Sequence, residues 1–207
     1  MYQSFSPNML KTFELCPKKF HFKYIKNISM PTNDEIFELG KNIHALASYY
    51  LRKDNMYKME QSLSERERML WEYLKGLKYL SYEAVSTEYN LSVKIGDYFF
   101  GGRLDALVKD GDNFYILDYK TGSAPKNAKY DYQTMIYLLA VRAFYKTNNV
   151  TFIYLDLKNK EEVKIELTPD LVKEYETKLI EITNRINSSD FEKKNKDCKC
   201  EYNIICY

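Results

Sequence analysis

The sequence lacks any apolar run long enough to cross a bilayer, and it begins without the features of a secretory leader. The first residues, MYQSFSPNMLKTFELCPKKF, contain no apolar segment of the signal-peptide kind and no small-residue cleavage site. A membrane-spanning helix requires about 20 consecutive apolar residues, and no stretch of this chain reaches that length. We therefore expect a cytoplasmic protein with no membrane partner.

The chain also lacks a strong excess of either charge. Its 31 lysine and arginine residues nearly balance 29 aspartate and glutamate residues, which leaves a formal net charge of +2. Net charge therefore identifies no partner, and contact with nucleic acid would require a local basic patch. With 207 residues, no repeat and no low-complexity linker, the sequence predicts a single domain over residues 1–207 with one good core.

The periodicity of apolar residues predicts two helices, an antiparallel meander, a helix, two strands and a last helix. This order favours an α/β fold with a mixed sheet. A capping box of Ser64 and Glu67 begins the second helix, and Thr168 with Pro169 begins the last one. The expected helices are 34–53, a second from 64 onward, 130–145 and a last from 168 onward, and the expected strands are 85–95, 98–108, 113–120, 151–157 and 161–167.

Two carboxylates lie inside otherwise apolar strands of the meander. Asp105 follows Gly101-Gly102-Arg103-Leu104, and Asp118 begins Asp118-Tyr119-Lys120. A buried carboxylate without a partner costs several kcal/mol, so each requires a cation, hydrogen-bond donors or an exposed edge. Alternate side chains share a face of a strand, so Asp118 and Lys120 project together. If the hairpin brings Asp105 opposite Asp118, the pair could bind Mg²⁺ or Mn²⁺; the alternative is an ordinary surface pair of Asp118 and Lys120.

The segment GGRLDAL, a turn and then YILDYKTG resembles the active-site hairpin of the PD-(D/E)XK nuclease superfamily. The resemblance is to the RecB-like branch, in which G-x-x-D and D-x-K-T-G recur. It implies a restriction-endonuclease-like core with a central mixed sheet flanked by helices. It also implies that Asp105 and Asp118 are metal ligands, that the backbone carbonyl of Tyr119 is a further ligand, and that Lys120 is the catalytic lysine.

Five further positions match the same branch. Gly40 and His44 reproduce its G-x-x-x-H pattern, which makes His44 a candidate metal ligand, although a lone helical histidine is also typical of a core or surface. Gln133 and Tyr137 reproduce its Q-x-x-x-Y pattern, which implies contact with the DNA backbone or with the site. Glu88 matches a glutamate that would assist catalysis by holding a metal-bound water, although exposed strand glutamates are common.

Cysteine is scarce, and three of the four cysteines lie close to the C-terminus. In a reducing compartment, metal ligands or free thiols are more plausible than disulfides. The start SPNMLKTFELCPKKFHFKY resembles the opening of RecB-like nucleases that carry a four-iron four-sulfur cluster, such as CRISPR-associated exonucleases and the AddB nuclease domain. The resemblance implies a cluster that joins the two ends of the chain. The ligands would be Cys16, Cys198, Cys200 and Cys206.

The cysteine spacing departs from the family in one place. Cys198-Lys199-Cys200 replaces the usual C-x-x-C, with Asp197 at the position of the expected cysteine. Structural Zn²⁺ and free thiols therefore remain alternatives to the iron-sulfur cluster. The resemblance divides the chain into cluster-binding termini at 1–27 and 188–207, a helical insertion at 28–84 that carries His44, and a nuclease core at 85–167.

Together these features predict a metal-dependent DNA nuclease. We expect an exonuclease acting on single-stranded or frayed duplex ends with Mg²⁺ or Mn²⁺, in CRISPR adaptation, repair or phage DNA metabolism, with proteins of those pathways as partners. One alternative is a non-catalytic module that binds DNA ends or proteins. Another is an RNA-directed or restriction-type nuclease.

Overall fold

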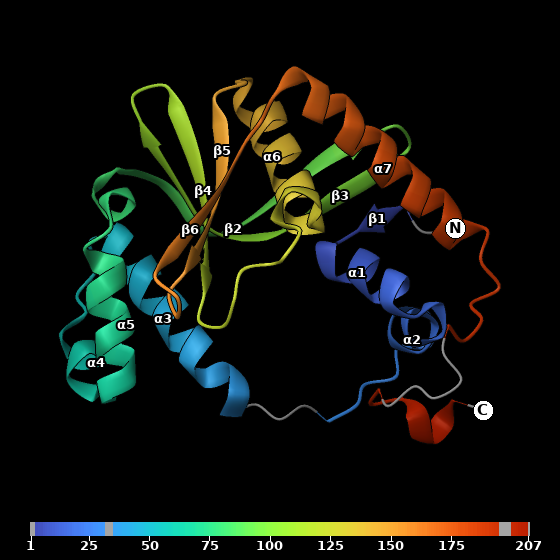
Figure 1. Cartoon of the computed structure of the whole chain (residues 1–207), viewed down its shortest axis with the longest axis horizontal. Coiled ribbons are helices and arrows are strands. Elements are labelled where there is room, and N and C mark those ends of the chain that lie inside the picture. Colours follow the sequence, from blue (N-terminus) through green and yellow to red (C-terminus); the bar gives the residue numbers. More distant parts are fainter. Residues whose placement is uncertain (1–2, 32–34, 195–199, 207) are drawn as a thin grey trace.

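A computed structural model describes residues 3–31, 35–194 and 200–206, with the side chains of residues 35–37 left out. Figure 1 shows a central sheet with helices on both of its faces. The sheet has six strands in the order β1-β3-β4-β5-β6, and β2 pairs with β3 outside this path. The strands are β1 (Ser4–Phe5), β2 (Glu83–Ile95), β3 (Tyr98–Asp110), β4 (Asn113–Lys120), β5 (Val150–Asp156) and β6 (Glu161–Glu166).

The predicted antiparallel meander is confirmed. Strands β2, β3 and β4 pair antiparallel in sequence order. Gly96 and Gly111 occupy the tight turns with φ values of +58° each, a backbone region that glycine adopts without steric cost. Strand β5 then pairs parallel with β4, and β6 pairs antiparallel with β5. The sheet is therefore mixed, as the sequence predicted.

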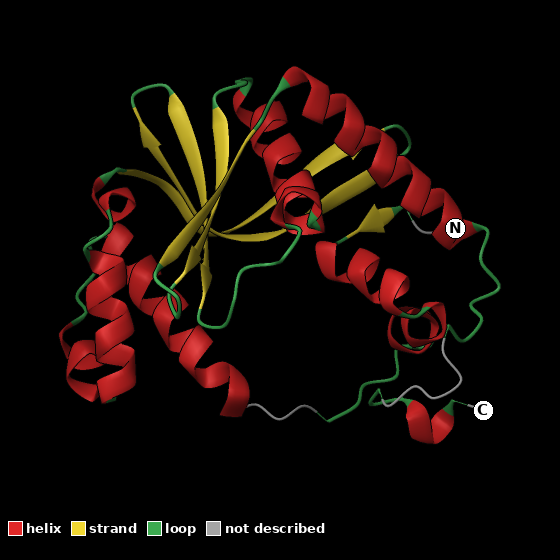
Figure 2. Cartoon of the chain, in the orientation of Figure 1, coloured by secondary structure: helices red, strands yellow, loops and turns green. Residues whose placement is uncertain are grey.

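Helices cover the sheet on both faces (Figure 2). The capping box of Ser64 and Glu67 begins α5, and the Thr168 hydroxyl accepts a hydrogen bond from Leu171 N at 3.3 Å to begin α7. Helix α6 begins at Tyr132, slightly later than expected, because Asp131 caps it by accepting from Gln133 N. The α-helices are α1 (Pro7–Leu15), α2 (Pro17–Phe20), α3 (Glu35–Leu51), α4 (Tyr57–Ser62), α5 (Glu65–Lys75), α6 (Tyr132–Tyr145) and α7 (Pro169–Asn187), with a π-helix η1 (His21–Ile25) and 3₁₀ turns η2 (Lys78–Ser81), η3 (Ala128–Tyr130) and η4 (Asn203–Ile205).

Each face of the sheet has its own apolar core. On one face, α1, α6 and α7 pack over residues such as Ile116 and Phe152, both fully buried. On the other, α3 and α5 pack over Leu117 and Ile153, also fully buried. Burial of one such side chain stabilises the fold by roughly 1.5–3 kcal/mol. Two cores hold α3 and α6 against opposite faces of the same strands.

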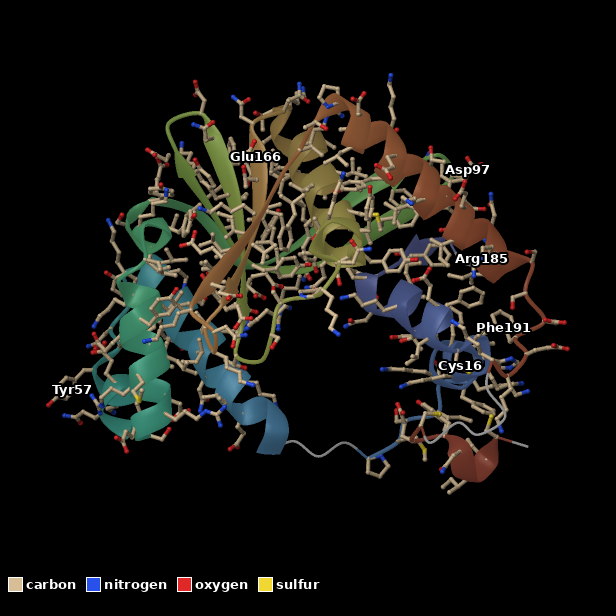
Figure 3. The ribbon with its side chains drawn as sticks, viewed as in Figure 1. Cys16, Tyr57, Asp97, Glu166, Arg185 and Phe191 are labelled. Atoms are coloured by element: carbon tan, nitrogen blue, oxygen red, sulfur yellow. The ribbon has the colours of Figure 1, made fainter. Side chains whose placement is uncertain are left out.

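The C-terminal segment packs against the N-terminal helices. The Phe191 ring stacks on Phe20 with ring centroids 6.0 Å apart. Beyond it, the Tyr202 hydroxyl donates to the Ile28 carbonyl at 2.7 Å, and Lys19 Nζ lies 3.0 Å from Glu201 Oε2. Figure 3 shows Phe191 and Cys16 close together at this end of the molecule. The two ends of the chain therefore meet.

Among the described residues, no helix has both the length and the apolar character required to cross a membrane.

Candidate active site

The hairpin of β3 and β4 brings the two strand carboxylates side by side. Ala106 pairs with Leu117 in the antiparallel ladder, and continuing this register places Asp105 opposite Asp118. The backbone N–H of Tyr119 donates to Asp105 Oδ2 at 3.1 Å. The sequence alone did not show whether the hairpin brings Asp105 opposite Asp118. In the structure the two residues do lie opposite each other.

His44 approaches Asp105 from α3. Its Nδ1 lies 3.3 Å from Asp105 Oδ1, and its Nε2 lies 2.9 Å from the Tyr119 carbonyl oxygen. Burial disfavours the charged imidazole, but hydrogen bonds and negative charge from Asp105, with Tyr119 and Asp118 contributing, raise the pKa of His44 above its usual value. The imidazole thus contacts two of the groups that the family resemblance names as metal ligands, the Asp105 carboxylate and the Tyr119 carbonyl.

Glu88 joins this group from β2, and its backbone is strained. Its φ is +50°, which is uncommon for a residue with a side chain and costs of order 1–3 kcal/mol. Ligand atoms of His44, Glu88 and Asp105 all lie within 4.8 Å of one another. Arg103 Nε lies 2.9 Å from Glu88 Oε2, on the open side of the group. Strain of this kind is typical of functional sites, and the residue pattern gave no sign of it.

Asp118 and Lys120 form an ion pair next to this group. Lys120 Nζ lies 2.6 Å from Asp118 Oδ2, and Gln133 Nε2 donates to Asp118 Oδ1 at 3.1 Å. Lys120 Nζ also donates to Gln133 Oε1 at 3.4 Å. Burial and the neighbouring charge of Asp105 raise the pKa of Asp118 to about 6, although Lys120 and His44 favour the carboxylate. Gln133 therefore orients both members of the pair from α6.

Tyr137 packs against β3 from α6. The side chain is 4% exposed, and its hydroxyl donates to the Arg103 carbonyl at 3.0 Å. A Cβ atom at Gly102 would lie 2.7 Å from that hydroxyl, so glycine is required at this approach. Of the two roles expected for Tyr137, contact with the site is the one that its position supports.

The donor set fits a divalent cation. Carboxylate and carbonyl oxygens with one imidazole are suitable ligands for Mg²⁺ or Mn²⁺. Asp118 Oδ2 is buried, and the Lys120 ammonium 2.6 Å away compensates its charge. A metal ion bound to this carboxylate would provide compensation of the same kind.

Comparison with known proteins decides the family. The model of the PD-(D/E)XK nuclease superfamily matches residues 4–207. The chain belongs to the PD-(D/E)XK nuclease superfamily. Its sheet and flanking helices are the restriction-endonuclease-like core that the sequence predicted.

Two similar proteins support this assignment. A CRISPR-associated exonuclease Cas4 from Francisella tularensis subsp. novicida is 28% identical over 123 residues, which are 57% of this chain and 61% of that protein. The match therefore spans less than two thirds of the relative. The crystal structure of a candidate exonuclease from Eubacterium rectale has a TM-score of 0.59 and 11% identity, and the superposition covers 96% of this chain and 86% of that one. The similarity to this crystal structure shows that the two proteins share a fold.

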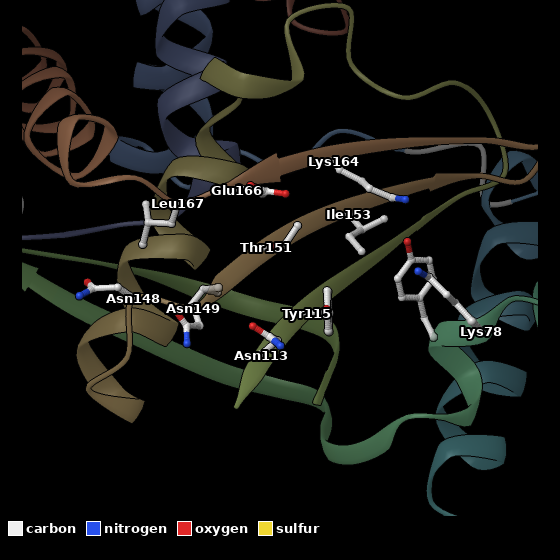
Figure 4. A pocket seen from close by; sticks show the side chains of 12 residues that line it. Lys78, Asn113, Tyr115, Asn148, Asn149, Thr151, Ile153, Lys164, Glu166 and Leu167 are labelled. Atoms are coloured by element: carbon white, nitrogen blue, oxygen red, sulfur yellow. The ribbon is translucent and has the colours of Figure 1, made fainter. Parts of the chain in front are cut away.

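In this PD-(D/E)XK chain, a groove of about 660 Å³ leads to the metal-donor group. His44 and Glu88 of that group line it, together with residues that include Tyr49, Arg52 and Arg103. A separate cavity of about 450 Å³ lies at the other end of β4 and β5 (Figure 4). Its lining includes the amide side chains of Asn113, Asn148 and Asn149, the lysines Lys78 and Lys164, and one carboxylate, Glu166. No histidine lines it, so it lacks the combination of imidazole and carboxylate donors that the active-site groove has.

Three of the four cysteines predicted to hold a cluster, Cys16, Cys200 and Cys206, lie where the N-terminal and C-terminal segments of the chain meet. Cys16, between α1 and α2, is 6% exposed, Cys206 is 8% exposed and Cys200 is half-buried. Lys194 Nζ donates to the Glu14 carbonyl at 2.6 Å, and Lys193 Nζ donates to the Cys206 carbonyl at 3.3 Å. Cys198 lies outside the described residues. The only group of three or more possible metal donors among the described residues is His44, Glu88 and Asp105, so the cluster itself stays a prediction.

Proposed function

We propose that this chain is a metal-dependent deoxyribonuclease, an exonuclease that hydrolyses phosphodiester bonds at single-stranded or frayed DNA ends. The observation that carries the proposal is the convergence of His44, Glu88 and Asp105 within 4.8 Å, beside the ion pair of Asp118 and Lys120. Four separate elements, α3, β2, β3 and β4, supply these groups. If Asp118 and Lys120 formed only a structural ion pair, that pair would not explain why the His44 imidazole and the strained Glu88 lie beside it.

Each side chain has a role in this reaction. Asp105, Asp118, His44 and the Tyr119 carbonyl would hold Mg²⁺ or Mn²⁺, and Glu88 would hold a water bound to the ion. The ion would lower the pKa of that water and offset charge on the phosphate. Gln133 holds Lys120 at its site, and the lysine donates N–H groups to the phosphate oxygens on which charge develops. The nucleophile would be the water oriented by Glu88 and Lys120. Tyr137 holds β3 in place through the Arg103 carbonyl.

The chain would be divided as the resemblance implies, with a nuclease core at 85–167, a helical insertion at 28–84 and cluster-binding termini. In this proposal Cys16, Cys198, Cys200 and Cys206 bind a four-iron four-sulfur cluster. Burial of Cys16 and Cys206, and contact between the two terminal segments, support it. Zn²⁺ is the alternative metal.

The named relative suggests the biological setting. It is a CRISPR-associated exonuclease. We therefore infer a cytoplasmic role in CRISPR adaptation, repair or phage DNA metabolism, with proteins of those pathways as partners.

The test uses end-labelled single-stranded and duplex DNA with Mn²⁺. We expect the parent to shorten DNA from an end, and Asp118→Ala and Lys120→Ala to lose at least about 100-fold in rate, because such groups act on the reacting phosphate. Exposed Asp97→Ala, in the turn between β2 and β3, is the matched control and should cleave as the parent does. A parent that binds DNA ends without metal-dependent cleavage would instead indicate a non-catalytic binding module.

A further inference from the structure

The active-site groove has a wall made by one face of α3. Lys41, His44, Ser48 and Arg52 recur at three- and four-residue spacing and all line the groove. At 1.5 Å per residue, the wall from Lys41 to Arg52 extends about 16 Å. Several phosphates of one strand fit along this length, because their spacing in a stacked strand is about 3.4 Å. The groove is therefore long enough for a strand and passes the metal donor His44.

Cationic side chains line this groove. Lys41 comes from α3, Arg52 directly follows the end of that helix, and Arg103 comes from β3. Arg52 Nε lies 2.8 Å from Asp54 Oδ2, with both side chains close to half exposed. An exposed pair of this kind contributes about 0–1 kcal/mol, so a phosphate can take the place of Asp54 at little cost. The guanidinium groups suit bidentate contact with phosphate oxygens.

Tyr49 presents an aromatic ring on the same wall. The side chain is 37% exposed although it is large and apolar. The Arg52 guanidinium carbon lies 4.8 Å from the centre of the Tyr49 ring, so the cation supports one side of the ring. A ring held in this way on a groove wall provides a flat surface for stacking. Ser48, the preceding residue, donates to Thr87 Oγ1 at 2.9 Å and fixes this turn of α3 against β2.

We propose that the groove binds one unpaired strand of the substrate, with a base stacked on Tyr49 and phosphates on Arg52, Lys41 and Arg103. The proposal rests on the proposed function, and it names the residues that select single-stranded DNA. A base within a duplex is stacked between its neighbours and offers no free face to an aromatic side chain. Stacking on Tyr49 therefore distinguishes an unpaired end from a closed duplex, and phosphate contact alone does not.

The chain offers matched controls for both kinds of contact. Tyr57 on α4 is 67% exposed, and Figure 3 places it at the opposite end of the molecule from Cys16. Arg66 on α5 is also exposed. Neither residue lines the active-site groove. Tyr57→Ala and Arg66→Gln therefore report the effect of removing an exposed ring or an exposed charge elsewhere.

The experiment measures binding of fluorescent oligonucleotides in EDTA, where no cleavage occurs, over a range of salt concentrations. We expect Tyr49→Ala to weaken binding of single-stranded DNA about 5- to 100-fold, the range for loss of one stacked base. Arg52→Gln should weaken it too and should reduce the slope of log affinity against log salt by about 0.7. Blunt duplex binding should change less than about twofold for Tyr49→Ala, and both control variants should match the parent.

The outcomes separate this inference from the proposed function. If Tyr49→Ala binds single strands as tightly as Tyr57→Ala does, the groove is not the strand's path, even where the parent cleaves DNA normally. If the variant weakens single-strand and duplex binding equally, selection of unpaired bases by Tyr49 is wrong. A parent that fails to cleave but depends on Tyr49 for binding would overturn the proposed function and leave the groove assignment intact.

Discussion

The ammonium of Lys120 lies 2.6 Å from the Oδ2 atom of Asp118, two residues earlier on the same strand. Lys120 is partly exposed at its tip, whereas the Asp118 carboxylate is 4% exposed. Desolvation of that carboxylate exceeds the stabilisation by the lysine, which is why the pKa of Asp118 rises to about 6. The metal-free protein therefore holds a carboxylate at neutral pH at a cost in stability.

Asp118→Asn should stabilise the metal-free protein at neutral pH. A carboxyl whose pKa is raised by folding binds its proton more tightly in the folded state, so stability falls as pH rises from about 4 to the folded pKa of about 6. Replacing the carboxylate with an amide removes this loss. We expect the Tm in EDTA to rise by roughly 2–6 °C at pH 7.5 and to change little at pH 4. Asp54→Asn, at an exposed pair, should leave Tm unchanged; a lower Tm for Asp118→Asn at pH 7.5 would contradict the account.

Binding of Mn²⁺ should weaken as pH falls through the raised pKa of His44. A protonated imidazole cannot ligate a cation, so the ion must displace a proton. Calorimetry in two buffers of different ionisation enthalpy should show proton release by the parent near pH 7. His44→Asn should bind Mn²⁺ more weakly and release less. His21, whose pKa burial and nearby lysines lower, is the matched control, and His21→Asn should behave like the parent. Equal proton release by the parent and His44→Asn would exclude His44 as a ligand.

Arg103→Gln should strengthen Mn²⁺ binding in the absence of DNA. The Arg103 guanidinium holds the Glu88 carboxylate at 2.9 Å and repels a nearby cation, so its removal frees one oxygen donor. We expect about a two- to fivefold tighter affinity, the effect of breaking one partly exposed ion pair. Lys109→Gln breaks a pair with Glu83 at 3.1 Å on the same two strands and should have no effect. Weaker Mn²⁺ binding by Arg103→Gln would show that Glu88 does not approach the ion.

Gly102→Ala should destabilise the protein because its Cβ would lie 2.7 Å from the Tyr137 hydroxyl. We expect the free energy of unfolding to fall by about 1–3 kcal/mol, the usual cost of overpacking. Tyr137→Phe removes the hydroxyl, so Gly102→Ala should cost less in that background. At Gly122 a Cβ atom would meet nothing within 4 Å, and Gly122→Ala should be neutral. If the losses in the free energy of unfolding from Gly102→Ala and Tyr137→Phe were additive in the double variant, the Tyr137 hydroxyl would not be the atom that the added methyl group overpacks.

Protein purified without oxygen should be brown, with broad absorbance near roughly 400 nm from an iron-sulfur cluster. Cys206→Ser should lose the colour and lower Tm, because the cluster would join the two ends of the chain. Chemical analysis should give about four irons for each chain. Colourless protein with one equivalent of zinc would support the alternative metal.

Local sequence patterns predicted the parts of the fold that depend on neighbours in the chain. Alternation placed Asp118 and Lys120 on one face of β4, and Gly96 and Gly111 marked the turns of the meander. The resemblance added His44 and Gln133, and the structure brings both to the hairpin. Each of these predictions rests on strand periodicity, turn geometry or a motif of fixed spacing.

Long-range packing decided what those patterns leave open. Glu88, His44 and Asp105 meet because α3 and β2 pack around one edge of β3, and the left-handed backbone at Glu88 exists only within that arrangement. Tyr137 contacts the Arg103 carbonyl because a second apolar core holds α6 on the other face of the sheet. The sequence determined which groups carry the chemistry. The tertiary structure decided which of them touch, because contacts between distant segments depend on burial of whole helix faces and not on residue spacing.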